Sequence, residues 1–155
     1  MTGRRDPARD MEAARAIARQ AASLGGAAYY VGGFVRDRLL GRENTDVDIE
    51  VHGVTPRQLA EILDGMGGRL EMGASFGIYG LKERATGRGH RDFQVSVDPF
   101  LGTEQAARRR DFTVNALMEN VLTGQVLDHF HGLDDLRRGI LRHVDSRTFP
   151  EDPLR

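Results

Sequence analysis

The chain has 155 residues, which is enough for one domain with a hydrophobic core. Its 22 basic and 23 acidic residues give a net charge of −1, without the basic excess of a protein that grips a long nucleic acid over its own surface. The absence of cysteine excludes disulfides, thiolate catalysis and cysteine-bound metals. No apolar run approaches a membrane span and the charged N-terminus lacks a signal core, so we expect a cytoplasmic protein that does not use a membrane.

Helices and strands alternate in the first half of the chain. Apolar residues at helical spacing predict helices over residues 10–24, 34–40 and 55–66. Thr55 is suited to cap the third of these helices, with Pro56 in its first turn. Two β-rich segments predict strands over residues 28–31 and 45–52.

The second half continues this mixture. Strands are predicted over residues 70–72, 78–81 and 93–97, helices over 103–109 and 133–138, a hairpin between 112–121 and 125–130, and a last strand over 140–144. The polar, glycine-containing segment 83–91 is predicted to be a mobile loop. The whole pattern indicates an α/β (α+β) domain built on one sheet.

A glycine pair separates the first predicted strand from the helix that follows it. Gly32 and Gly33 lack a Cβ, so a triphosphate can approach the backbone N–H groups of this turn closely. Arg36 lies one turn into the helix, within reach of a phosphate or a ribose. The alternative is a tight turn without a ligand, because glycine pairs are common turn signals.

Two acidic residues alternate with apolar ones along the second predicted strand. Asp46 and Asp48 then share one face of this strand. Paired carboxylates are hard oxygen ligands that suit Mg²⁺ when it also binds phosphates, as in phosphoryl transfer. The alternative is a solvent-facing strand face that is simply acidic, since Glu50 continues the pattern.

A third cluster is basic. Arg108, Arg109 and Arg110 precede an apolar segment that contains Asp111 and Asn115. Arginine is suited to bidentate contact with phosphate, and the last two side chains can bond ribose hydroxyls. Taken alone, the cluster also fits a solvated run of charges.

Other site classes find less support. His129 and His131 would share a face on a strand, but no further histidine or cysteine completes a zinc site. There is no nucleophile elbow for a hydrolase, and the glycine pair does not form the GxGxxG pattern of a dinucleotide fold.

Five segments together resemble one family. YVGGFVRDRLLG (30–41) and TDVDIE (45–50) are similar to the GGxVRD and DxD signature of class II tRNA nucleotidyltransferases and bacterial poly(A) polymerases. RRDFTVNA (109–116), LDHFHGLDDL (127–136) and EDPLR (151–155) resemble further segments of that family, in the same order. The resemblance covers residues 28–155.

The resemblance implies a polymerase-β-like nucleotidyltransferase head, with a mixed, curved sheet backed by helices. It implies that an RNA 3′-hydroxyl attacks the α-phosphorus of CTP or ATP and releases pyrophosphate. Catalysis then depends on Mg²⁺ bound by Asp46 and Asp48, and on positioning. The predicted nucleotide-binding residues are Gly32, Gly33, Arg36, Arg110, Asp111 and Asn115, the last two near the ribose.

The same resemblance divides the chain into an N-terminal helix (1–26), the head (27–148) and the start of a truncated neck (149–155). The family's neck, body and tail, which select C or A and make most contacts with the tRNA 3′ end, would follow that point. Family members also carry an acidic strand for which there is no room after Leu81. Besides CCA addition by a fragment of low or no activity, this leaves a poly(A) polymerase and a catalytically dead nucleotide-binding or interaction module as alternatives.

Overall fold

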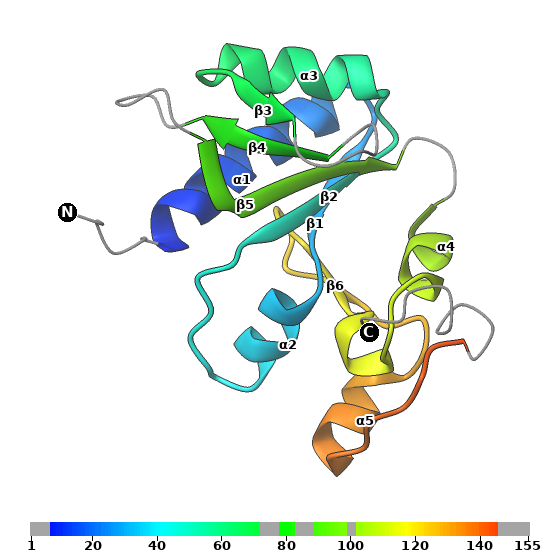
Figure 1. Cartoon of the computed structure of the whole chain (residues 1–155). Coiled ribbons are helices and arrows are strands. Elements are labelled where there is room, and N and C mark those ends of the chain that lie inside the picture. Colours follow the sequence, from blue (N-terminus) through cyan, green and yellow to red (C-terminus); the bar gives the residue numbers. More distant parts are fainter. Residues whose placement is uncertain (1–6, 72–77, 83–88, 99–101, 146–155) are drawn as a thin grey trace.

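A seven-stranded mixed sheet forms the centre of the molecule (Figure 1). The computed structural model describes residues 7–71, 78–82, 89–98 and 102–145. The strands are β1 (Ala27–Tyr30), β2 (Asp48–His52), β3 (Arg69–Glu71), β4 (Ile78–Lys82), β5 (Gly89–Asp98), β6 (Met118–Asn120) and β7 (Val126–Leu127). The helices are α1 (Pro7–Ser23), α2 (Gly33–Leu39), α3 (Pro56–Gly65), α4 (Gly102–Arg108), α5 (Gly132–Arg138) and the 3₁₀ helix η1 (Thr113–Asn115).

The order of the strands across the sheet is β3-β4-β5-β2-β1-β6-β7. All neighbouring strands are antiparallel except β2 and β5, which run parallel. In the registers of β2, Glu50 lies opposite Tyr29 of β1, and Asp48 lies opposite Gln94 of β5. The expected α/β class with a mixed sheet is therefore confirmed.

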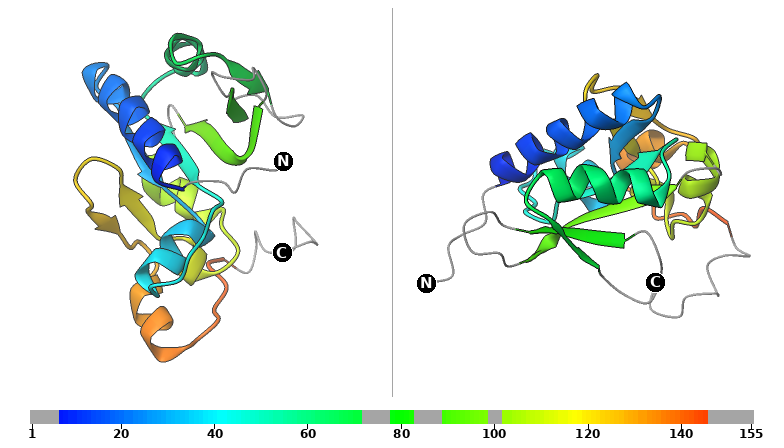
Figure 2. Two further views of the ribbon diagram at one scale, coloured as in Figure 1. Left: turned by 90° about the vertical axis from the view of Figure 1, so that its left-hand side faces the viewer. Right: turned by 90° about the horizontal axis from the view of Figure 1, so that it is seen from above.

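Two helices, α1 and α3, lie side by side against one face of the sheet (Figure 2). The fully buried side chains between these layers include Ile17, Leu63, Ile49 and Val51. Burying each such side chain stabilises the fold by about 1.5–3 kcal/mol. Because side chains alternate along β2, covering Ile49 and Val51 directs Asp48, Glu50 and His52 to the opposite face.

The remaining helices gather around the end of the sheet where β1 leads into α2 (Figure 1). A second apolar cluster holds α4 and the segment after it against the sheet, through Val31, Ala107, Ala116 and Met118. The helix α5 packs against η1, and the Thr113 hydroxyl donates a 2.7 Å hydrogen bond to the buried carboxylate of Asp135. Within the described part of the chain, no helix combines the length and apolar character needed to cross a membrane.

Most predicted elements are confirmed within a few residues, and Thr55 caps α3 in a full capping box with Pro56 in the first turn. Four predictions are wrong. The hairpin is present, but its strands are limited to β6 and β7, because residues 113–115 of the first predicted strand form the 3₁₀ helix η1. The second strand begins at Asp48, not at residue 45, and the strand expected at 140–144 is reduced to one isolated bridge at His143. Residues 89–91, expected in a loop, belong to β5 because they pair with β4. The rest of that loop (83–88) and residues 149–155 lie outside the described residues.

Candidate active site

The turn between β1 and α2 can be made only by glycine. Gly32 has φ 70° and ψ −148°, a combination that a side chain would strain. Just before it, the Val31 N–H donates to the Asp48 carbonyl at 3.0 Å, which ties this end of β1 to the start of β2. The predicted glycine turn and one predicted metal ligand are thus neighbours. Since α2 has only seven residues, a phosphate at this turn would be held by side chains more than by a helix dipole.

The two predicted metal ligands lie on different kinds of backbone. Asp48 is the half-buried first residue of β2, whereas Asp46 is exposed and precedes the strand. The Asp46 N–H donates to the Asn44 side-chain oxygen at 2.8 Å, so the loop is held by a turn instead of by the sheet. Two carboxylates fit Mg²⁺ that completes its shell with water and phosphate oxygens. The described residues contain no group of three or more metal-ligating side chains.

A hydrogen-bond network joins three of the predicted nucleotide-binding residues. The Arg36 guanidinium donates to Asn115 Oδ1 at 2.7 Å, and Asn115 Nδ2 donates to Asp111 Oδ1 at 3.1 Å. Arg36 Nε also donates to Asp37 at 3.0 Å, and Asn44 donates to the same carboxylate at 2.7 Å. Burial alone would raise the pKa of Asp37, but these hydrogen bonds outweigh it and lower the pKa.

Arg110 approaches the glycine turn at Gly32. Its Nη2 donates to Glu50 Oε2 at 3.2 Å. Its Nη1 lies 3.7 Å from where a Cβ on Gly32 would be, and Arg36 Nη2 lies 3.2 Å from the equivalent position on Gly33. The structure therefore brings both predicted arginines to the two glycines. Arg108 instead pairs with Glu104 at 3.1 Å along α4, so the solvated-charge interpretation fits that residue.

Residues 28–142 of the sequence match the family described as the poly A polymerase head domain. The chain belongs to this family of nucleotidyltransferases. A Multifunctional CCA protein of Methylobacillus flagellatus is 40% identical over 138 residues, which cover 82% of this chain and 32% of the relative. The head domain thus spans about a third of the length of the curated relatives it matches.

Solved structures agree with this assignment. The CCA-adding enzyme of Thermotoga maritima complexed with tRNA is similar to the head domain at a TM-score of 0.76 and 26% identity, over 96% of this chain and 38% of that one. The Bacillus stearothermophilus CCA-adding enzyme in complex with CTP gives a TM-score of 0.76 and 29% identity, over 97% and 37%.

Sequence reasoning missed the burial of Glu50 in this head domain. The prediction of a solvent-facing acidic strand face is wrong beyond Asp48, because Glu50 and His52 are buried at 9% and 8% exposure. Burial by itself would raise the pKa of Glu50, but the hydrogen bond with His52 and the charge of Arg110 lower it. The sequence carried no signal for this burial, because strand alternation separates the two faces of β2 but does not show what covers each face.

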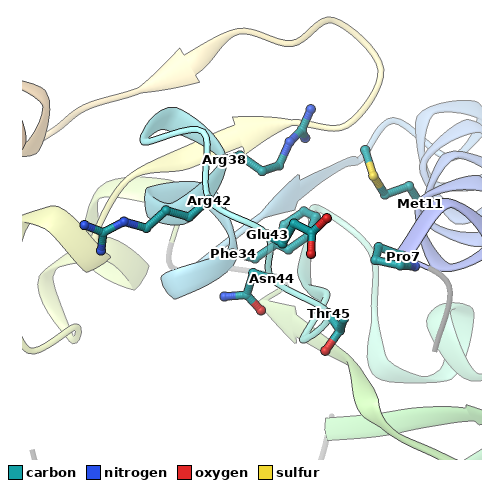
Figure 3. Close-up of a pocket in the computed structure, with 8 residues that line it drawn as sticks. All are labelled: Pro7, Met11, Phe34, Arg38, Arg42, Glu43, Asn44 and Thr45. Carbon is teal, nitrogen blue, oxygen red and sulfur yellow. The ribbon is translucent and has the colours of Figure 1, made fainter. Parts of the chain in front are cut away.

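Two other features lie apart from these residues. A cavity of about 380 Å³ opens between α1 and the loop that leads to Asp46 (Figure 3), and none of the predicted site residues lines it. Its lining consists of Pro7, Met11, Phe34, Arg38, Arg42, Glu43, Asn44 and Thr45. His129 and His131 do not share a strand, because β7 ends at Leu127; His129 instead lies 3.0 Å from the Thr103 hydroxyl.

Proposed function

We propose that the chain is the catalytic head of a CCA-adding tRNA nucleotidyltransferase that binds CTP and ATP with Mg²⁺. The observation that carries this proposal is the convergence of Arg36, Arg110 and Asp48 on the turn at Gly32 and Gly33. A triphosphate needs close backbone approach, bidentate cations and nearby metal ligands. These requirements meet at one end of β1.

Each residue has a role in the proposed reaction. The 3′-hydroxyl oxygen of the RNA bonds to the α-phosphorus, the bond from that phosphorus to the bridging β-oxygen breaks, pyrophosphate leaves, and the hydroxyl proton passes to solvent. Arg36 and Arg110 bind the triphosphate, while Asp111 and Asn115 orient the ribose. Asp46 and Asp48 would hold Mg²⁺, which when bound neutralises phosphate charge and activates the hydroxyl.

We assign residues 27–148 to the head, 1–26 to an N-terminal helix and 149–155 to the start of a neck. In this proposal the tRNA 3′ end is bound mainly by other parts of a longer protein. Relatives named for CCA addition are about three times as long as the region they share with this chain. The absence of a basic excess in this chain supports that division. The reaction would take place in the cytoplasm, where tRNA and nucleoside triphosphates meet.

A second candidate is a head that binds nucleotides without transferring them. Gln94, an exposed amide, lies in register beside Asp48 on the neighbouring strand, where a further carboxylate would strengthen a metal site. The closest acidic residue before it on β5 is Asp92. Loss of nucleotide transfer in an Asp92→Asn variant would favour the enzyme. Nucleotide binding by the wild type without transfer, even when the remaining domains of a relative are supplied in trans, would favour the binding module. A product of A residues alone would indicate a poly(A) polymerase.

Calorimetric titration of CTP with and without Mg²⁺ tests the proposed site. We expect Mg²⁺-dependent binding by the wild type and an affinity loss of about tenfold or more in Asp46→Ala, because one of two metal ligands is removed. Asp134→Ala removes an exposed carboxylate of α5 and serves as the control. Binding that is unchanged in Asp46→Ala would contradict the assignment. Transfer is then measured on tRNA lacking its terminal CCA, with the remaining domains of a relative supplied in trans.

A further inference from the structure

Glu50 is a buried carboxylate in contact with Arg110, one of the proposed phosphate ligands. Both oxygens of Glu50 are engaged: Oε2 accepts from Arg110 at 3.2 Å, and Oε1 lies 2.6 Å from His52 Nε2. An ionised carboxylate can only accept hydrogen bonds, so the contact requires the proton on Nε2 of His52. Glu50 is therefore held by two partners at one face of β2.

The surroundings of this carboxylate fix it further. Tyr29 lies opposite Glu50 in the register of β1 and β2, and its ring meets the His52 ring edge-on at 5.6 Å between centroids. The other ring nitrogen of His52, Nδ1, is buried and has no hydrogen-bond partner among the described residues. If the Glu50 side chain turned away from these partners, it would leave a buried charge unpaired, which is costly.

Arg110 connects this buried pair to the open site. One end of its guanidinium bonds Glu50, while the other end, Nη1, faces Gly32, and about a third of the side chain is exposed. We propose that Glu50 is a positioning residue that holds the Arg110 guanidinium over the glycine turn, ready to bind the triphosphate of the incoming nucleotide. This inference rests on the proposed function, because it takes Arg110 to be a phosphate ligand.

A pair elsewhere in the sheet shows what a purely structural role would look like. Glu119 of β6 accepts from Arg38 at 2.9 Å, with the arginine stacked over the rings of Tyr30 and Phe34. Because Tyr30 belongs to the face covered by α1 and α3, this second pair lies on the side of the sheet away from Arg110. Glu119→Gln is therefore a matched control for Glu50→Gln.

The test is a double-mutant cycle read by calorimetry, with CTP and with inorganic triphosphate as ligands. Glu50→Gln keeps the shape of the side chain but removes its charge, and we expect the affinity for both ligands to fall about tenfold. In an Arg110→Ala background, Glu50→Gln should cause no further loss, because its effect passes through the arginine. Glu119→Gln should leave both affinities unchanged.

The outcomes distinguish a failure of this inference from a failure of the proposed function on which it rests. A wild-type protein that binds neither ligand would overturn the proposed function and this inference with it. If the wild type binds, the inference alone is overturned by an unchanged or tighter affinity in Glu50→Gln, by a loss for CTP without one for inorganic triphosphate, or by a full further loss in the Arg110→Ala background. Should circular dichroism show that Glu50→Gln is unfolded, Glu50→Asp, which keeps the charge but withdraws it from Arg110, takes its place under the same criteria.

Discussion

Asn44 is the residue through which the loop carrying Asp46 is joined to the Arg36 network. Its oxygen accepts from the Asp46 N–H, and its nitrogen donates to Asp37, which in turn binds Arg36. No motif in the sequence pointed to Asn44, because an asparagine in a loop is an ordinary turn residue. Through its two hydrogen bonds, Asn44 supports both a proposed metal ligand, Asp46, and the Asp37 carboxylate that binds Arg36.

We expect Asn44→Ala to lower the free energy of unfolding by about 1 kcal/mol and to weaken Mg²⁺-dependent CTP binding severalfold, since Asp46 loses its turn. Asn120 offers a control, because its side-chain oxygen accepts from the N–H groups of Leu122 and Thr123 in the turn between β6 and β7, which contains none of the proposed site residues. Asn120→Ala should cost similar stability without changing CTP affinity. Equal effects of both variants on binding, measured by calorimetry, would refute a special role for Asn44.

The residue patterns predicted some contacts and not others, for a physical reason. The glycine pair and Arg36 meet as expected because a strand, a turn and a helix fix their positions locally. Arg110 reaches the same turn from a segment far along the chain, and only the family resemblance implied its place there. The burial of Glu50 could not be foreseen, because alternation separates the two faces of a strand but does not say what covers each face. On this face Glu50 contacts Arg110, which lies 60 positions further along the chain.

Among the secondary-structure elements, α5 packs against η1, the 3₁₀ helix that contains Asn115 and follows Asp111. Asp135 of α5 accepts from the Thr113 hydroxyl and from Arg142. The hydrogen bond from Thr113 lowers the pKa of Asp135, and Arg142 adds to this effect against the opposing influence of burial. A carboxyl whose pKa is lower in the folded state stabilises the fold above its unfolded pKa of about 4, and this contribution is lost as the pH falls through the folded value.

Asp135→Asn should therefore be less stable than the wild type at pH 7, and the difference between the two should shrink at pH 3. Urea unfolding followed by far-UV circular dichroism measures both values, as the chain contains no tryptophan. The exposed neighbour Asp134, which pairs with Arg137 at 3.3 Å, supplies the comparison. Asp134→Asn should change stability little at either pH. A gap for Asp135→Asn that is as large at pH 3 as at pH 7 would rule out the ionised carboxylate as its source.

Element boundaries were less predictable than the elements themselves. The alternation that predicted a strand from Thr45 continues through Asp46, but the backbone there bonds Asn44 and not a neighbouring strand. Conversely, residues 89–91 have a loop-like composition yet extend β5, because Lys82 of β4 pairs with Gly89. Both differences arise from pairing partners distant in sequence, which local composition does not encode.

For the whole molecule, the two faces of the sheet differ in what they carry: apolar core residues on one and the proposed site residues on the other. One face is covered by α1 and α3 and carries the largest apolar cluster, while the other directs Asp48 and Glu50 toward the site. Packing of the apolar residues on one face of the strands therefore fixes the position of the polar residues on the opposite face, near one end of β1. This division explains how a chain that spans about a third of its relatives can still bring together the residues of the proposed triphosphate site.

If the head reads only what all nucleotides share, it should bind CTP, ATP, GTP and UTP with affinities within about fivefold of one another. Its proposed ligands, Arg36, Arg110, Asp111 and Asn115, address phosphates and ribose, whereas one hydrogen bond read on a base edge would already be worth about 1.4 kcal/mol, or tenfold. Competition calorimetry with Mg²⁺ measures the four affinities, and 2′-deoxy-CTP, which lacks a hydroxyl for Asp111 and Asn115, should bind more weakly than CTP. A preference for CTP above tenfold would mean that the base is already read within these 155 residues, and that the selection of C or A does not wait for other parts of a longer protein.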